Sequence, residues 1–123
     1  MLSSIRRSLA LLAALCATGV AAAPRAESAL ECGIAADMAI VAHSLATEEV
    51  QRAKADTIMA RIYDVGESER GKALMKEITD AAYVSTATAA AGGSTTGQKF
   101  AEDLFASCMK SGGNMDGVLG KKT

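Results

Sequence analysis

Apolar residues recur at helical spacing directly after residue 28. Five large ones follow one another at intervals of four, four, three and four positions: Leu30, Ile34, Met38, Val41 and Leu45. This spacing places side chains on one face of an α-helix. Ser28, with a glutamate three residues later, has the pattern of a capping box. The sequence therefore predicts a helix over residues 29–46 with this stripe as its apolar face.

Small residues lie beside that stripe on the same predicted helix. They are Cys32, Ala35, Ala36, Ala39 and Ala42. Because the distance between two packed helices depends on the side chains at the contact, small residues allow a close neighbour. We expect another helix to approach on this flank.

A second helix is predicted over residues 48–63, with Thr47 as its N-cap and two glutamates in its first turn. Its expected buried side consists of Ala55, Ile58, Met59 and Ile62. Glu48, Arg52 and Asp56 are spaced four residues apart and predict a solvated ladder of ion pairs. The junction near residue 47 contains no glycine or proline, so one long or kinked helix over residues 29–63 is the alternative.

The third predicted helix covers residues 69–84, with Ser68 as its cap. Its expected core positions are Leu74, Met75, Ile78, Ala81 and Ala82. The following residues, 85–98, have no charge and almost no bulk, which predicts a flexible loop whose first alanines can extend the helix slightly.

A fourth helix is predicted from Gln98 to the glycine pair Gly112 and Gly113. One side of it carries Phe100, Ala101, Leu104, Phe105 and Cys108. The remaining tail, residues 114–123, offers Val118 and Leu119 for packing and is otherwise expected to fray. With abundant alanine and few strand signals, the whole pattern predicts an all-α fold, a small bundle of about four helices.

The first residues have the pattern of a secretory signal peptide. Arg6 and Arg7 precede a short apolar run that ends in small residues, which predicts cleavage of residues 1–22 and a periplasmic or secreted protein. A cut after Ala26 is the alternative. The run is too short and too rich in alanine for a stable membrane anchor. The mature chain then has one helical domain, residues 23–113, and the tail 114–123.

Two cysteines remain in the mature chain, Cys32 and Cys108. Exported compartments permit oxidation, so we predict a Cys32–Cys108 disulfide that closes most of the domain and contributes roughly 4 kcal/mol. A redox-active or metal-binding pair is the rival interpretation. Redox pairs usually lie close together in sequence and metal sites need further ligands, whereas the chain has a single histidine, His43.

Charge argues against two classes of partner. Without Arg6 and Arg7, 11 of the 13 basic residues remain against 14 acidic ones, a formal charge of −3. A mildly acidic chain without a basic run does not favour binding to nucleic acid or to anionic lipid headgroups. The chain also contains no recognisable catalytic, cofactor or metal motif, so we expect no enzyme, cofactor or metal site. His43 is expected at the surface or with satisfied ring nitrogens.

These features predict a small exported, non-enzymatic protein that acts by contact with an envelope protein. The alternative is a carrier of a small apolar ligand or a metal ion, with His43 or methionines as contacts. Alanine-rich faces also permit a homo-oligomer. In layout alone, an exported helical chain of about a hundred residues with two cysteines, the protein resembles small periplasmic acid-stress chaperones and some secreted immunity or inhibitor proteins.

Overall fold

The computed structural model describes residues 25–66, 68–90 and 96–120. These residues form helices and no strand. In chain order the helices are α2 (Ala29–Thr47), α3 (Arg52–Ile62), α4 (Glu69–Ala90), α5 (Gly97–Lys110) and the short α6 (Asp116–Leu119). The predicted small all-α class, with four substantial helices, is confirmed. The predicted signal peptide, residues 1–22, lies outside the described residues.

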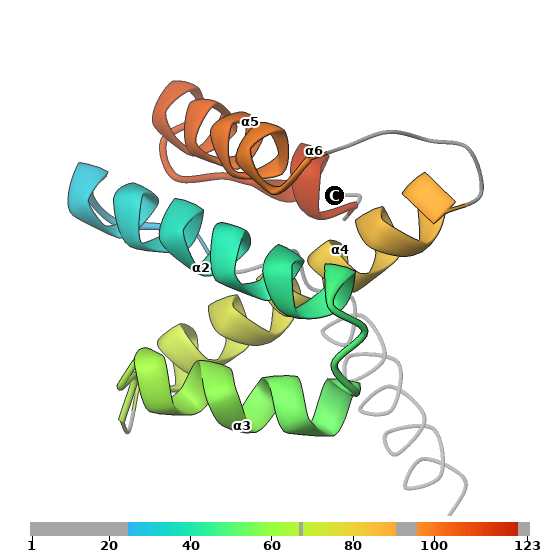
Figure 1. The fold of residues 1–123 in the computed structure, drawn as a ribbon. Coiled ribbons are helices and arrows are strands. Elements are labelled where there is room, and N and C mark those ends of the chain that lie inside the picture. The colour runs from blue at the N-terminus through green and yellow to red at the C-terminus, as the bar shows by residue number, and fades with distance from the viewer. Residues whose placement is uncertain (1–24, 67, 91–95, 121–123) are drawn as a thin grey trace, which may run out of the picture.

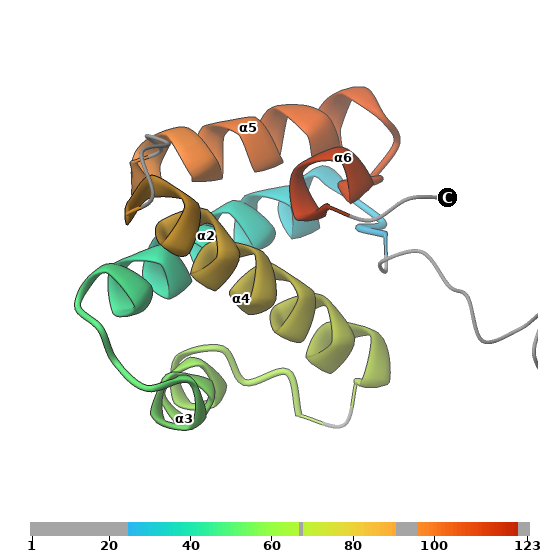
Figure 2. The same cartoon turned by 90° about the vertical axis from the view of Figure 1, so that its right-hand side faces the viewer.

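Helix α2 occupies the centre of the bundle. It packs mainly against α5 and α4, and to a lesser extent against α3 (Figure 1). Helices α2 and α5 run antiparallel, because Cys32 meets Cys108 at one end while His43 meets Gly97 at the other. Helix α6 packs against α5 and α4, and α3 lies at the edge of the bundle (Figure 2).

The buried face of α2 combines its flank of small residues with Met38 of the predicted apolar stripe, and Val41 and Leu45 of that stripe are partly buried. The buried residues of α2 are Cys32, Ala35, Met38, Ala39, Ala42, His43 and Ala46. By contrast, Leu30 and Ile34 are 74% and 41% exposed. Two helices, α4 and α5, crowd the same side of α2, and small side chains there let both approach its backbone closely. The number of neighbours therefore decided which face is buried.

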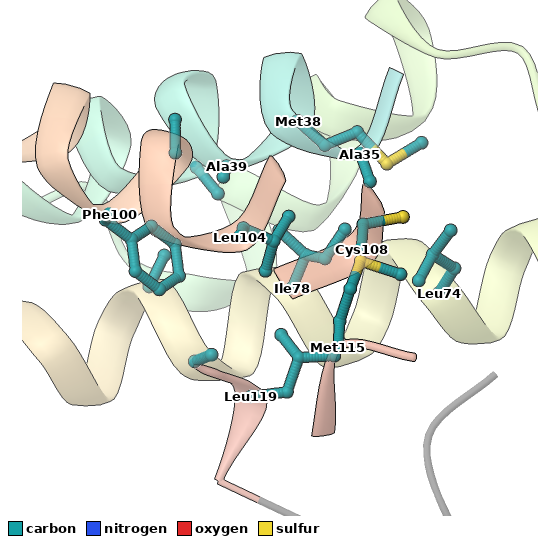
Figure 3. Close-up of a cluster of buried hydrophobic side chains, with 14 of the residues drawn as sticks. Ala35, Met38, Ala39, Leu74, Ile78, Phe100, Leu104, Cys108, Met115 and Leu119 are labelled. Carbon is teal, nitrogen blue, oxygen red and sulfur yellow. The ribbon is translucent and has the colours of Figure 1, made fainter. Parts of the chain in front are cut away.

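The other helices supply the bulk of the core. Figure 3 shows large core side chains of α4, α5 and the α6 region, namely Leu74, Ile78, Phe100, Leu104, Met115 and Leu119. Ile78, Leu104 and Met115 are completely buried. Large side chains opposite small ones fill the interior without voids, as close packing requires.

The predicted start of the second helix is wrong. Helix α2 continues to Thr47, Glu48 is its C-cap, and Glu49 has a positive φ of 62° that breaks the helix. Helix α3 begins only at Arg52, so neither a helix over 48–63 nor one continuous helix over 29–63 is present. Thr47 is the last residue of α2 and not an N-cap, and its Oγ1 lies 3.3 Å from Nδ1 of His43. The Tyr83 hydroxyl holds the connection by donating to the Val50 carbonyl (2.6 Å).

The predicted loop over residues 85–98 is also too long. Helix α4 extends to Ala90, and Thr86 and Thr88 donate their hydroxyls to carbonyls one turn back. Alanine's high helix propensity prevails there over the lack of bulk. Helix α5 starts at Gly97 with Thr96 as N-cap, whose hydroxyl accepts from the Lys99 amide (3.0 Å). Residues 91–95 of the predicted loop lie outside the described residues.

The C-terminal tail does not fray as predicted, at least to residue 120. Met115 is completely buried, Leu119 is 8% exposed, and the two lie at either end of α6. Before α6 the chain passes close to the first described residues, where the Ala26 amide donates to the Gly113 carbonyl (3.0 Å). A Cβ on Gly113 would lie 1.9 Å from the Ala26 oxygen, and its φ is +94°. Only glycine fits this crossing.

The predicted disulfide between Cys32 and Cys108 is present. Their sulfur atoms are 2.00 Å apart and their Cα atoms 5.7 Å apart. Both side chains are buried at the contact between α2 and α5. The bond joins residues separated by 76 positions and closes nearly the whole described chain.

Candidate functional site

Helix α2 is apolar on almost every side. It contains no lysine or arginine, and it is the single helix in the described part of the chain that is long and apolar enough to cross a membrane by those two criteria. In the fold it contacts α3, α4 and α5, as a central bundle helix does. Three neighbours still leave one side of it open, and that side is apolar as well.

Large hydrophobic side chains gather around this open side. Leu30, Ile34 and Ile40 of α2 are 74%, 41% and 44% exposed, and Ile62 of α3 and Phe105 of α5 flank them at 53% and 41%. We call these five residues the α2 surface. An exposed apolar group of this kind on a small protein commonly marks an interaction site.

One groove of the α2 surface lies between α2 and the end of α3. It has a volume of about 630 Å³, and its apolar walls include Leu30, Ile34, Met38, Ile62 and Val65. Two carboxylates, Asp37 and Asp64, also line it. We call it the α2–α3 groove.

The polar contact in this groove joins α2 to the residue after α3. The Tyr63 hydroxyl donates to the Asp37 carboxylate. Burial of the phenol, reinforced by the adjacent Asp37 carboxylate, raises the pKa of Tyr63 above its ordinary value. The phenol therefore stays neutral and remains a donor to Asp37.

A second groove lies on the other flank of α2, against α5. It has a volume of about 550 Å³ and is lined by Ala36, Ile40, Gln98, Ala101, Glu102 and Phe105. The Gln98 side chain donates to the Glu102 carboxylate (3.1 Å). We call it the α2–α5 groove. The small residues Ala36 and Ala101 line this groove together with the exposed side chains of Ile40 and Phe105.

His43 is buried, contrary to the expectation of a surface or satisfied histidine. Its ring lies 5.8 Å from the ring of Phe100, and Gly97 packs directly against it. Nδ1 faces the Thr47 hydroxyl at 3.3 Å, but Nε2 is buried without a hydrogen-bond partner. Position 43 follows the small-residue flank in sequence, and that placement was the available signal for its burial.

The methionines behave mainly as core residues. Met38, Met59 and Met115 are buried, Met75 is half-buried, and Met109 is 48% exposed. Within the described ranges, no three His, Cys, Asp or Glu residues come together in a group that could hold a metal ion. Cys32 and Cys108 are engaged with each other.

Sequence reasoning missed the α2 surface. It assigned Leu30 and Ile34 to the core, placed Phe105 on the inner side of its helix, and did not single out Ile40. The available signal was that α2 contains too few polar residues to cover a solvent-exposed face.

No family model, curated protein or solved structure matches this chain. The functional argument therefore starts from the α2 surface and its two grooves.

Proposed function

We propose that this protein is a small exported, non-enzymatic binding protein that acts by protein contact, and that the α2 surface is its contact site. One observation carries the proposal. Seven large hydrophobic side chains are exposed among the described residues. Three belong to α2, Ile62 and Phe105 line the grooves on its two flanks, and the other two are Val84 and Met109. Exposing that apolar area to water is unfavourable, at about 25 cal/mol for each Å², so a partner that covers it gains the difference.

Export is the second part of the proposal. It is supported by the N-terminal pattern of Arg6, Arg7 and the apolar run, and by the pairing of the two cysteines that would remain after cleavage. Disulfides persist in oxidising compartments such as the periplasm. An intact mass under denaturing, non-reducing conditions tests it. We expect the mass of residues 23–123 less the hydrogens lost in forming the disulfide, and a full-length mass would contradict cleavage.

The contact site is tested by photo-crosslinking in intact cells. A photoreactive amino acid is placed at Ile34 or at Ile40, and in a matched control at Val84, a 65% exposed residue of α4 outside the α2 surface. We expect a discrete polypeptide adduct from both α2 positions and none from position 84. Equal adducts from all three positions, or none from Ile34 and Ile40, would contradict the proposal.

The alternative function, a carrier of a small apolar ligand or a metal ion, has its support in His43. The buried, unpartnered Nε2 is the kind of atom that binds a metal or a polar ligand group. We favour protein contact, because five exposed residues and two grooves support it, whereas a single ring nitrogen supports the carrier function.

A further inference from the structure

The charged residues that line the α2–α3 and α2–α5 grooves are all acidic. Among the described residues that line the two grooves, Asp37, Asp64 and Glu102 carry charge, and none is lysine or arginine. None of these three carboxylates forms an ion pair with a cation in the described part of the chain. Lys99, one helical turn before Asp103 on α5, is paired with that residue at 2.6 Å.

An apolar groove whose charged lining residues are carboxylates selects its partner by charge. A second copy of this chain would bring like charges together if the same faces met, and anionic lipid headgroups would be repelled as well. A polypeptide with apolar residues and flanking lysines or arginines meets both requirements of the surface. Its apolar side chains cover the isoleucines and its cations pair with the carboxylates.

The length of the α2–α3 groove suits an amphipathic helix as the bound polypeptide. The α2 residues that line it run from Ala29 to Met38, about 14 Å along the helix axis at 1.5 Å per residue. Apolar anchors at positions i, i+3 or i+4, and i+7 of an amphipathic helix span about 11 Å, which fits within that length. This spacing is the usual geometry of helix recognition in a groove.

On this basis, and resting on the proposed function, we propose that the occupant of the α2–α3 groove is a cationic amphipathic helix. Its apolar face contacts Leu30, Ile34 and Ile62. Its lysines or arginines pair with Asp37 and Asp64, which lie at the same groove.

The test uses the oxidised mature protein, residues 23–123, and three synthetic helical peptides labelled with a fluorophore. The first is a leucine–lysine amphipathic helix, the second has glutamate in place of every lysine, and the third has the lysine peptide's composition in a non-amphipathic order. Fluorescence anisotropy measures their affinities. We expect binding of the first peptide alone, weakened by added salt.

Two double variants with the same change in net charge locate the cations. Asp37→Asn with Asp64→Asn removes the groove carboxylates and leaves position 37 an oxygen that can accept from Tyr63. Glu48→Gln with Glu49→Gln removes two exposed carboxylates outside both grooves. We expect the first pair to weaken binding about ten-fold, the loss typical of two exposed ion pairs, and the second to leave it unchanged.

The other outcomes separate this inference from the proposed function. If the glutamate peptide binds as well as the lysine peptide, or if the groove variant binds normally, charge selection is wrong. If Ile34→Ser then still abolishes binding, the contact site itself stands. Binding of no peptide, or sedimentation of the protein as a dimer that Ile34→Ser dissociates, overturns the cationic helix as occupant. In either case crosslinking from Ile34 and Ile40 in cells judges the contact site independently.

Discussion

The two ends of the described chain and helix α3 are held in place by different kinds of interaction. The start and the end of the described chain meet at the disulfide, and we call this part of the molecule the disulfide end. There a covalent bond joins Cys32 to Cys108, the Ala26 amide donates to the Gly113 carbonyl, and Met115 is completely buried. In α3, by contrast, Ala55 and Met59 are the fully buried residues among eleven.

Polar contacts hold much of α3. Arg52 pairs with Asp80 of α4 at 2.5 Å and lies 5.7 Å from the centre of the Tyr83 ring. At its other end Tyr63 donates to Asp37. Partly exposed ion pairs contribute little, commonly about 1 kcal/mol or less. Stability is therefore uneven in this small bundle, and the less stable element is the one that forms a wall of the α2–α3 groove, where local opening can admit a partner.

The largest expected effect is loss of the disulfide. Reduction should lower the free energy of unfolding by about 4 kcal/mol, because a closed loop of this length restricts the unfolded chain. Urea denaturation with and without reductant measures it. In the double variant Cys32→Ala with Cys108→Ala, reductant should change nothing. An equal midpoint for oxidised and reduced wild type would show that the disulfide end does not depend on its covalent bond.

Two buried methionines compare the regions directly. Met115 and Met59 are both 0% exposed. We expect Met115→Ala to cost about 3 kcal/mol, within the usual range for a buried methionine, and Met59→Ala to cost less, because the loosely held α3 can collapse onto the vacated space. Chemical denaturation of both variants measures the difference. Equal costs would remove the distinction between a rigid disulfide end and a yielding α3.

The contact between α3 and α4 should be worth less than 1 kcal/mol. A double-mutant cycle with Arg52→Ala and Asp80→Ala should give a coupling of about 0.5 kcal/mol, because both side chains are about one-third exposed. Amide hydrogen exchange in α3 should accelerate in Arg52→Ala. Lys99→Ala breaks a more exposed ion pair within α5 and should leave exchange in α3 unchanged. Acceleration in α3 in both variants would exclude a specific role for Arg52.

The smallest effect concerns pH at the disulfide end. Hydrogen bonds from Arg70 (2.7 and 2.8 Å) lower the pKa of Glu31 to about 2. Because the folded-state pKa is depressed, the pair stabilises the fold above the ordinary pKa of about 4.5, and that contribution is lost as the pH falls from there toward 2.

Melting temperatures of wild type and Glu31→Gln test this sign. The wild type should be the more stable at pH 6, and the difference should shrink by pH 3. In an Arg70→Gln background the same substitution should make a smaller difference at pH 6, because the Glu27 amide still donates to the carboxylate (2.8 Å). A gap between wild type and Glu31→Gln that widens on acidification would contradict the assignment.

Sequence patterns predicted the helices and the disulfide, but they placed part of the candidate site wrongly. Ser28 and Ser68 cap their helices as expected, since their hydroxyls accept from the amides of Glu31 and Gly71. Thr47 was also predicted as an N-cap, but α2 continues through it and α3 begins only at Arg52. A capping pattern describes neighbours in sequence and does not show whether the preceding helix continues through the cap residue.

By itself the sequence determined the local structure of this protein. Helical spacing depends on residues three and four positions apart, and the two cysteines predicted to remain in the mature chain have one possible intramolecular pairing. Tertiary structure alone decided which side of α2 faces water, because apolar residues lie on almost every side of that helix and its burial depends on α4 and α5, far away in sequence. It likewise decided that residues 113–119 pack against the rest, since the core that receives Met115 exists only after the helices have assembled.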